Sequence, residues 1–362
     1  MATLCNKRVL VTGGTGFIGS HLTRSLLRLG AEVAVTTKYN SVIDNVRIAD
    51  IWSRVRVIEA DLRNLDSLLM LKKFAPQVIF HLAAYNHVGD SFTHIAESLD
   101  ANGKGTANLL RACDDFERFV YISTSEVYGS QDSVPFVETM VPKPVSPYSV
   151  GKYAGELYCR MLMEEMKRPI AIVRPFNAFG PYQSTRAVIA ETILTCLDGR
   201  PVFATEGCQT REFNYVSNLV DGMILAAEKD EAVGRVINIG AGEEIAICDL
   251  IRMIHRETGS SSELHIGALP NRPTEIWRMR ADNARAKQFL EWEPKVPFVE
   301  GLRRTIAWFR DFRAEFENPE AGLQRLAAKS AEGPLPTTSS SPASSDTDGA
   351  QPNASRAAVV SA

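Results

Sequence analysis

The first half of the chain alternates short apolar runs with segments whose apolar residues recur at helical spacing. The helical pattern is clearest over residues 17–29 and 65–74. Runs of strand length occur at 8–12, 32–35, 55–59, 78–81, 119–123 and 170–174. Strands separated by helices form βαβ units, which join into a parallel sheet with helices on both faces. The sequence therefore predicts an α/β fold with a doubly wound parallel sheet.

After Gly180 the alternation loosens, and short strand-like runs mix with helical patterns. This change predicts a sheet domain over residues 1–180, to which some later segments return, and a smaller α/β lobe over residues 181–315. The short runs lie at 213–216 and 236–239, and the helical patterns at 217–228, 248–258 and 298–312. Residues 331–362 are rich in Ser, Pro, Thr and Gly, which predicts a disordered tail because few large apolar side chains are there to offset the entropy of ordering.

Composition excludes several classes of partner. The chain has 362 residues, is 45% hydrophobic and carries a net charge of −3. Its pI is about 6.1, so the overall charge attracts neither nucleic acid nor an anionic membrane. The start resembles no signal peptide, and the sequence has no run of about 18 apolar residues for a membrane span. We expect a soluble protein that binds neither nucleic acid nor membrane.

The cysteines are spread singly, with no CxxC pair. Such spacing favours reduced, mostly buried thiols over a disulfide framework or a zinc site, and it predicts a cytoplasmic location. The six residues are Cys5, Cys113, Cys159, Cys196, Cys208 and Cys248.

The first predicted strand runs directly into TGGTGFIG, residues 12–19. Gly14, Gly16 and Gly19 satisfy GxGxxG, and Gly13 begins an overlapping GxxGxxG spacing. Glycine allows a tight turn and lets the backbone approach a pyrophosphate at the N-terminus of the next helix. A purely structural turn could contain the same residues. The position between a strand and a helix near the N-terminus favours dinucleotide binding.

The end of the second predicted strand lacks the acidic residue that holds the adenosine ribose of NAD. The chain reads VTTK there, ending at Lys38. Lys38 could accept the 2′-phosphate of NADP, or it could be an exposed lysine at a strand end, so both cofactors stay open. Asp61 and Leu62 follow the third strand and are placed to touch the adenine, although Asp at such a position also caps helices.

The stretch STSEVYG, residues 123–129, places a carboxylate among three small alcohols directly after a buried run. An ordinary solvated turn or the capped start of a helix has the same residue types. Taken alone, the stretch leaves these interpretations and a catalytic one equally open. Its meaning depends on the motifs elsewhere in the chain.

Tyr148 and Lys152 stand four residues apart at the start of a predicted helix. This spacing puts both on one face, so an ammonium near the phenol can favour the ionised form. A free tyrosine titrates near ~10, and a neighbouring lysine with an oxidised nicotinamide would let it act as a base around neutral pH. A surface pair at i and i+4 is the alternative interpretation.

The motifs occur in the order TGGTGFIG, HLAA, STSEVYG, YSVGK, RPFNAFGP and REFNYV. Together they resemble the extended short-chain dehydrogenase/reductase family of nucleotide-sugar enzymes over residues 6–315. Further phrases are most similar to NAD(P)-dependent nucleotide-sugar 4,6-dehydratases, particularly the bacterial branch acting on N-acetylhexosamine nucleotides: RAVI, NIGAGEEIAICDL, and RPTEI followed by ADNARAKQFLEWEP. The resemblance implies a Rossmann-type fold with a smaller C-terminal substrate lobe.

By this resemblance, Thr124, Tyr148 and Lys152 form the hydride-transfer triad, and Glu126 is an acid/base carboxylate. Tyr148 would take the proton of the sugar 4-hydroxyl while C4 gives its hydride to tightly bound NAD+ or NADP+. Glu126 would remove the hydrogen on C5, water would leave from C6, and the hydride would return to C6. Ser125 stands where glucose-nucleotide dehydratases of the family commonly carry Asp. Either Ser125 assists the loss of the hydroxyl through a bound water, or Glu126 serves as both base and acid.

The resemblance also implies contacts to substrate and cofactor. Asn177, Arg186, Arg211 and Arg272 are expected to bind the nucleotide-diphosphate sugar, because guanidinium groups hold phosphates bidentately. A surface ion pair is the alternative for each arginine. Beside Lys38, Asp61, Leu62, Tyr148 and Lys152, the implied cofactor contacts are Gly13, Gly16, Phe17, Ile18, Gly19, Leu82, Ala83 and Ala84.

Three further expectations concern histidine, metal and assembly. His81, which ends a strand in HLAA, is expected to be structural, and no metal site is predicted. Relatives of this kind are commonly homodimers, and helices near residues 102–113 and 148–166 have enough apolar surface to pair with a second copy.

The rival functions are a UDP-glucuronate-type decarboxylase, a 4-epimerase and a non-catalytic dinucleotide-binding protein. The decarboxylases also show STSEVYG, but SPYSVGK and RAVI suit dehydratases better. An epimerase needs no base at C5, so Glu126 argues against it. Non-catalytic relatives typically lose the tyrosine or the lysine, and this chain has both.

Overall fold

A seven-stranded sheet forms the centre of the protein in the computed structural model, which describes residues 3–38, 46–271, 274–317 and 358–359. The strand order is β11-β6-β5-β4-β1-β2-β3, and every neighbouring pair is parallel. The strands are β1 Arg8–Thr12, β2 Glu32–Thr37, β3 Arg56–Glu59, β4 Val78–His81, β5 Arg118–Ile122, β6 Ile170–Pro175 and β11 Val236–Ile239. The predicted doubly wound parallel sheet is confirmed.

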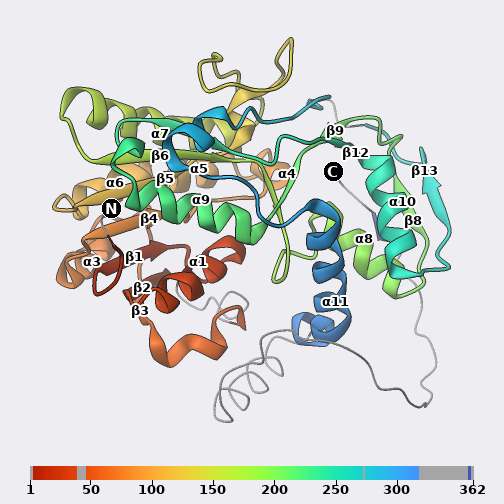
Figure 1. Ribbon diagram of the computed structural model, residues 1–362, viewed down its shortest axis with the longest axis horizontal. Helices are drawn as coiled ribbons and strands as arrows, with labels where there is room; N and C mark the ends of the chain where they lie inside the picture. The colour runs from red at the N-terminus through yellow and green to blue at the C-terminus, as the bar shows by residue number, and fades with distance from the viewer. Residues whose placement is uncertain (1–2, 39–45, 272–273, 318–357, 360–362) are drawn as a thin grey trace.

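Helices cover both faces of this sheet (Figure 1). Val9 and Val11 of β1 pack into one core, and Leu10 between them packs into the other. Because both faces are buried, the strands read as continuous apolar runs. The first core lies under α1 Phe17–Arg28 and α9 Val216–Glu228; the second lies under α3 Leu69–Phe74, α6 Gly105–Ala112 and α7 Pro147–Glu165.

The carboxyl ends of three neighbouring strands meet at one edge. Thr12 at the end of β1 pairs with His81 at the end of β4, and His81 pairs with Tyr121 of β5. The segments that follow these strands are the glycine-rich stretch, HLAA and STSEVYG. Sheet register therefore brings three motifs that are distant in sequence to one place.

A smaller α/β lobe with its own core lies beside the sheet. It contains α8 Val188–Leu197, β8 Val202–Ala204, α10 Ile247–Thr258, β13 Leu264–Ile266 and α11 Phe298–Glu317. Two short pairs lie between lobe and sheet, β7 Asn177–Phe179 with β10 Phe213–Tyr215, and β9 Thr210–Arg211 with β12 Ile245–Ala246. Because β11 and α9 return to the sheet, the chain passes between the two parts more than once.

Short helices complete the described chain. They are η1 Ala49–Arg54, η2 Asp66–Leu68, α4 Val88–Ser91, α5 Ile95–Leu99, η3 Asp100–Lys104, η4 Ser125–Tyr128, η5 Asp230–Ala232 and η6 Ala286–Leu290. In the tail that we expect to be disordered, two residues form the strand β14 Ala358–Val359 beside β8. The other tail residues lie outside the described residues.

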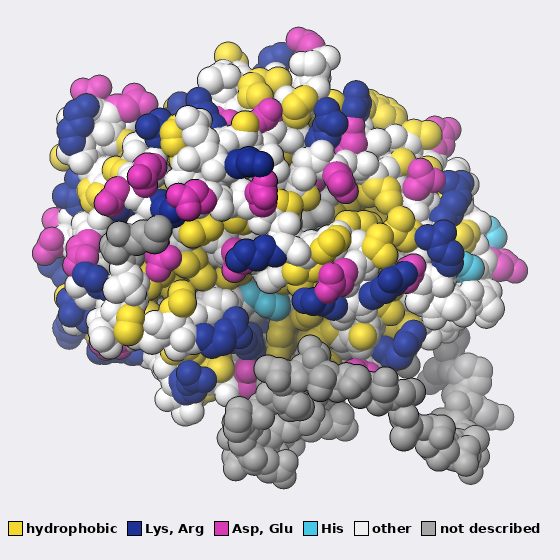
Figure 2. All heavy atoms as spheres, viewed as in Figure 1, with side chains coloured by type: hydrophobic (Ala, Val, Ile, Leu, Met, Phe, Trp, Pro, Cys, Tyr) yellow, Lys and Arg dark blue, Asp and Glu magenta, His cyan; other side chains and the backbone are white. Residues whose placement is uncertain are grey.

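The surface carries charges of both signs. In Figure 2, lysine and arginine side chains are interspersed with aspartate and glutamate across the face that is shown. Among the described residues, no helix has the length and apolar character that crossing a membrane requires.

Candidate active site

The glycines after β1 leave no room for side chains. A Cβ on Gly19 would lie 2.1 Å from the Gly13 carbonyl oxygen, and a Cβ on Gly13 would lie 2.9 Å from Cα of Ala83. Gly13 also has a φ of +69°, which favours glycine. Helix α1 has Gly16 as its N-cap and no side-chain cap, so its first N–H groups are available to an anion. These residues fit the pyrophosphate of a dinucleotide.

A cavity of about 250 Å³ lies at the ends of β2 and β3, where the adenosine half of such a cofactor would bind. Lys38 and Asp61 line it, together with Leu62. Arg63 also lines it and pairs with Asp61 at 2.6 Å, and its hydrogen bonds hold the pKa of the Asp61 carboxyl below its usual range. Lys38 Nζ lies 3.8 Å from Glu97 Oε1. With Asp61 neutralised by Arg63, this end suits either NAD+ or NADP+.

The STSEVYG segment borders two further cavities. Thr124 caps η4 by accepting the Glu126 N–H at 3.2 Å, and Ser125 is buried with its hydroxyl 3.4 Å from the sulfur of Met279. Glu126 lines a cavity of about 230 Å³ together with Gly13, Phe17, Ile18, Leu82, Ala84, Tyr148 and Lys152. It also lines a second cavity of about 540 Å³. One carboxylate therefore lies where the two cavities share a wall.

A capping box holds the start of α7, and with it the backbone of Tyr148, in place. Ser146 accepts the Ser149 N–H at 3.1 Å, and the Ser149 hydroxyl accepts the Ser146 N–H at 3.1 Å. Pro147 occupies the first turn, where its missing N–H costs nothing. Tyr148 follows directly and reaches the 230 Å³ cavity.

The phenol of Tyr148 hydrogen-bonds to Thr124, while the ammonium of Lys152 donates to the Ile122 carbonyl at 2.5 Å. Burial, with a smaller contribution from the nearby Glu126 charge, raises the pKa of Tyr148 to about 12, although the hydrogen bond with Thr124 opposes this rise. Burial lowers the pKa of Lys152 to about 8. The structure thus differs from our expectation that the ammonium favours the phenolate. A buried ammonium needs acceptors, and here the end of β5 supplies one.

A buried ion pair connects α7 to the sheet below the site. Glu156 on α7 pairs with Arg174 on β6, and neither side chain is exposed. The Ser123 hydroxyl donates to the same carboxylate at 2.7 Å. This contact ties the end of β5, from which the STSEVYG segment begins, to the helix that carries Tyr148.

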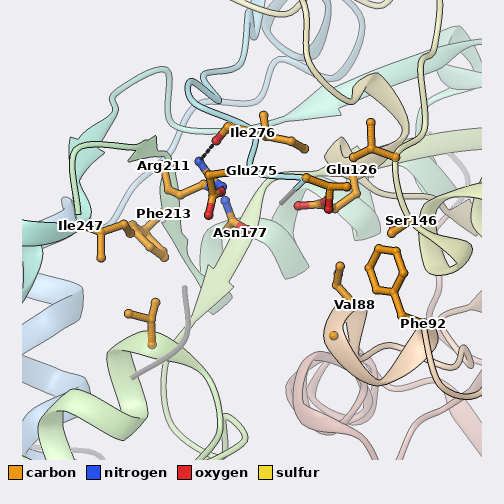
Figure 3. A pocket seen from close by; sticks show the side chains of 14 residues that line it. Val88, Phe92, Glu126, Ser146, Asn177, Arg211, Phe213, Ile247, Glu275 and Ile276 are labelled. Atoms are coloured by element: carbon orange, nitrogen blue, oxygen red, sulfur yellow. Dashed lines mark hydrogen bonds and ion pairs between the residues drawn. The ribbon is translucent and has the colours of Figure 1, made fainter. Parts of the chain in front are cut away.

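The 540 Å³ cavity lies between the sheet and the smaller lobe, and its wall is mainly apolar. Arg211 is its one cation among the described residues; it pairs with Glu275 and donates to the carbonyl of Ile276 (Figure 3). The Arg211 and Glu275 side chains are only 11% and 6% exposed. Figure 3 shows Glu126 and Asn177 facing the same space.

The other predicted substrate residues have different surroundings. Asn177 lines both shared cavities, and its amide donates to the Glu212 carbonyl at 2.9 Å. Arg186 is bound bidentately to Asp90 at 2.8 and 2.9 Å and lines a neighbouring cavity instead. Arg272 lies outside the described residues.

His81 is structural, as expected. Its side chain is fully buried, with Nδ1 2.7 Å from the Thr12 hydroxyl and Nε2 3.0 Å from the Thr106 hydroxyl. Burial holds its pKa well below the usual value. A neutral imidazole between two threonines therefore fastens β4 to β1 and α6.

A family model described as GDP-mannose 4,6 dehydratase matches residues 10–305. The chain belongs to this family. It is 31% identical to a dTDP-D-glucose 4,6-dehydratase from Bos taurus, over 88% of this chain and 93% of that protein. It is 34% identical to UDP-glucuronic acid decarboxylase 1 from Xenopus tropicalis, over 84% of this chain and 72% of that protein.

Among solved structures, the fold matches a UDP-glucuronic acid 4-epimerase from Bacillus cereus in complex with UDP-glucuronic acid and NAD. The TM-score is 0.78 at 31% identity, covering 84% of this chain and 99% of the other. Membership in the GDP-mannose 4,6 dehydratase family confirms the resemblance to the extended short-chain dehydrogenase/reductases. The protein is therefore an enzyme of the nucleotide-sugar dehydratase and epimerase kind, with an NAD(P) cofactor.

Several residues of the site were missed by sequence reasoning. Asn86 lines the cofactor cavities and could have been found, because it stands two residues after HLAA. Asn102 holds the same loop through two hydrogen bonds with the Tyr85 backbone, at 2.8 and 3.1 Å. No motif marks Asn102, Arg63 or the apolar lining residue Phe92, because their roles follow from packing.

Proposed function

We propose that this enzyme is a nucleotide-sugar 4,6-dehydratase that converts an NDP-hexose to the 4-keto-6-deoxy sugar. An N-acetylhexosamine nucleotide is the substrate class that we favour. The observation that carries the proposal is the position of Glu126 at the wall shared by the two cavities. The smaller cavity is lined by the glycines of the glycine-rich turn and by Tyr148. The larger cavity has the volume and the apolar lining that a sugar nucleotide needs.

The proposal assigns each chemical step to a side chain of the site. Bound NAD(P)+ supplies a hydride acceptor at C4 that gives the hydride back at C6, and its positive charge makes ionisation of the phenol easier. Tyr148, held by Thr124, takes the proton of the sugar 4-hydroxyl. The C4 ketone acidifies the hydrogen on C5, which Glu126 removes. Water then leaves from C6, protonated by Glu126 or through Ser125.

The charges around the site favour a dehydratase over a decarboxylase. A uronate substrate brings a carboxylate on C6, and a buried carboxylate needs a cationic partner. The described residues that line the two shared cavities include two cations, Lys152 and Arg211. Lys152 donates to the Ile122 carbonyl, and Arg211 is paired with Glu275. A neutral C6 hydroxymethyl group suits these surroundings better.

The decisive variant is Glu126→Gln, which keeps the shape of the side chain and removes the base. We expect C4 oxidation to continue and the elimination of water to slow by roughly 10²–10⁴-fold. Ultraviolet absorbance follows the reduced cofactor, which should accumulate, and product mass follows the loss of water. Dehydration by Glu126→Gln at the native rate would refute the role of the carboxylate.

Two further variants complete this experiment. Glu117→Gln removes a surface carboxylate that pairs with Lys7, so it should leave both steps unchanged. Ser125→Ala separates the two sources of the acid, because it slows only the elimination if Ser125 assists the departing hydroxyl.

The substrate and the rival reactions are tested by incubation with UDP-, GDP-, CDP- and dTDP-hexoses. Loss of water identifies the dehydratase, and loss of carbon dioxide from a uronate identifies the decarboxylase. An unchanged mass with inverted stereochemistry at C4 identifies the epimerase.

We also propose that the enzyme is a cytoplasmic homodimer. Large apolar side chains are exposed on two adjacent helices: Ile95 and Leu99 on α5, and Val150, Leu157 and Met161 on α7. Burying them against a second copy would remove apolar surface from water. Light scattering tests the dimer, and charged substitutions at Leu157 and Met161 should yield a monomer.

A further inference from the structure

Two cysteines stand on neighbouring segments of the smaller lobe, beside residues that line the 540 Å³ cavity. β12 pairs antiparallel with β9, with Ala246 opposite Thr210. Cys208 lies two residues before Thr210, and Cys248 lies two residues after Ala246. Helix α10 begins at Ile247, so Cys248 stands in its first turn while Cys208 stands just before β9.

Backbone contacts support this juxtaposition. The Ile247 N–H donates to the Gln209 carbonyl at 3.1 Å, and the Cys248 N–H donates to the Gly207 carbonyl at 3.0 Å. A Cβ placed on Gly207 would lie 3.0 Å from both Cα and Cβ of Cys248. Gly207 and Gln209 flank Cys208 on either side, so the segments that carry the two cysteines are in backbone contact, and disulfides span Cα separations of about 4.4–6.8 Å. The two segments are therefore close enough for a disulfide bond.

Both cysteine side chains are accessible to solvent. Gln209 and Ile247, the opposed pair next along, are buried, whereas Cys208 is exposed and Cys248 is partly exposed. Each cysteine therefore reaches the surface next to a buried residue of this pair. Both can therefore be reached by a small oxidant.

Three of the remaining cysteines are protected from such an oxidant. Cys113, Cys159 and Cys196 are buried, and burial raises the pKa of each thiol, to about 12 for Cys113. A thiol with a raised pKa contains little of the thiolate that reacts. Cys5 is exposed, but it lies before β1.

We propose that Cys208 and Cys248 form a reversible disulfide at the wall of the substrate cavity. The oxidant is a low-molecular-weight disulfide of the glutathione type. One protein thiolate attacks it and releases one glutathione, and the second protein thiol then displaces the other glutathione. In sum, two thiols lose two protons and two electrons to form the S–S bond, and one glutathione disulfide becomes two glutathiones.

This disulfide bond would restrict the positions of two residues that line the cavity. Ile247 directly precedes Cys248, and Arg211 follows Cys208 by three residues. Both line the 540 Å³ cavity. The disulfide would fix β9 relative to the start of α10 and hold these two side chains at one spacing. The inference rests on this wall and not on which sugar reaction the enzyme performs.

The test oxidises the full-length protein with glutathione disulfide and digests it without reductant. We expect one cross-linked peptide pair containing Cys208 and Cys248, and an intact mass lower by two hydrogens. Closing the loop should raise the apparent Tm by several degrees, and dithiothreitol should reverse both changes. Neither readout depends on activity, so the result stands whether or not the proposed dehydratase reaction is found.

Single variants sharpen the test. Cys208→Ser and Cys248→Ser should each lose the link and instead carry one glutathione on the remaining cysteine, whereas Cys5→Ser should keep the link. The wild-type peptide map decides the matter even where a variant folds poorly. Glutathione on both cysteines without a link, a link to a different cysteine, or two unmodified thiols would overturn the proposal.

Discussion

The cofactor end of the active site is built mainly from backbone, whereas the substrate end is built from side chains. At the cofactor end, the segments after β1, β4 and β5 are placed by sheet register, and glycines keep the space open. At the substrate end, the lining comes from segments spread between Val88 and Ile276. The buried pair of Arg211 and Glu275 holds part of this wall together.

This difference has a physical consequence. The glycine-rich turn leaves little room for added atoms, and its shape does not depend on a side-chain ion pair. A wall held by a buried ion pair depends on both charges. Removing one partner lowers the free energy of unfolding, because the other charge is left buried and uncompensated. The two ends should therefore respond to different kinds of substitution.

The largest effect is expected at the substrate end, from Arg211→Met. This change leaves the Glu275 carboxylate buried and unpaired, which should lower the free energy of unfolding by roughly 3 kcal/mol. Removing both charges, in the double variant with Glu275→Met, should restore most of the loss. Urea unfolding followed by circular dichroism measures both values.

Arg186→Met is the matched control for this experiment. Its ion pair with Asp90 is solvent-exposed, with the arginine side chain 59% accessible, so its loss should cost about 1 kcal/mol or less. Equal losses from Arg186→Met and Arg211→Met would contradict the view that burial makes the second pair important.

The next effect is expected at the cofactor end, from Gly19→Ala. The new Cβ would lie 2.1 Å from the Gly13 carbonyl oxygen, so the cradle must shift. We expect affinity for NAD+ and NADP+ to fall roughly 100-fold, equivalent to about 2.7 kcal/mol. Gly16→Ala is milder, because its Cβ would lie 3.2 Å from the same oxygen. Isothermal titration calorimetry should rank the two variants in this order, and unchanged binding by Gly19→Ala would argue against a rigid cradle.

The smallest effect tests whether the two ends are joined. His21 on α1 lies with Nε2 2.8 Å from the carbonyl oxygen of Pro181, which precedes the smaller lobe. Burial lowers the pKa of His21 from 6.5 to about 4. Between these pH values the unfolded chain binds the extra proton and the folded chain does not, so stability falls as pH falls. The loss is absent above pH ~6.5 and amounts to at most about 1.4 kcal/mol for each pH unit between ~6.5 and ~4.

His21→Gln keeps a hydrogen-bond donor and removes the titration. The difference in unfolding free energy between wild type and His21→Gln should therefore change between pH 6.5 and 4. Thermal melts across this range measure it. Parallel pH curves for the two proteins would mean that His21 does not couple α1 to the smaller lobe.

Much of the fold could be predicted because its signals are local. The apolar runs gave β1 and β4 with their observed bounds, and α1 to within one residue at its end. The glycine stretch, STSEVYG and the Tyr148 to Lys152 spacing also lie within short windows. Parallel strands bring such segments to one edge whatever the loops between them contain.

The partners of charged side chains could not be predicted in the same way. Lys152 donates to a carbonyl at the end of β5, and Arg186 pairs with an aspartate nearly a hundred residues away in the chain. Each charge takes the partner that packing offers, and sequence spacing does not show which partner that is.

The sequence by itself determined the parallel sheet and the glycine-rich turn, because each follows from periodicity or from a short motif, and the family resemblance predicted the side chains to which we assign the reaction. Only the tertiary structure decided that Glu126 stands between two cavities, that Glu275 neutralises Arg211, and that the segments carrying Cys208 and Cys248 are in contact. The reason is that these relations depend on the register and packing of segments far apart in the chain, which local pattern does not encode.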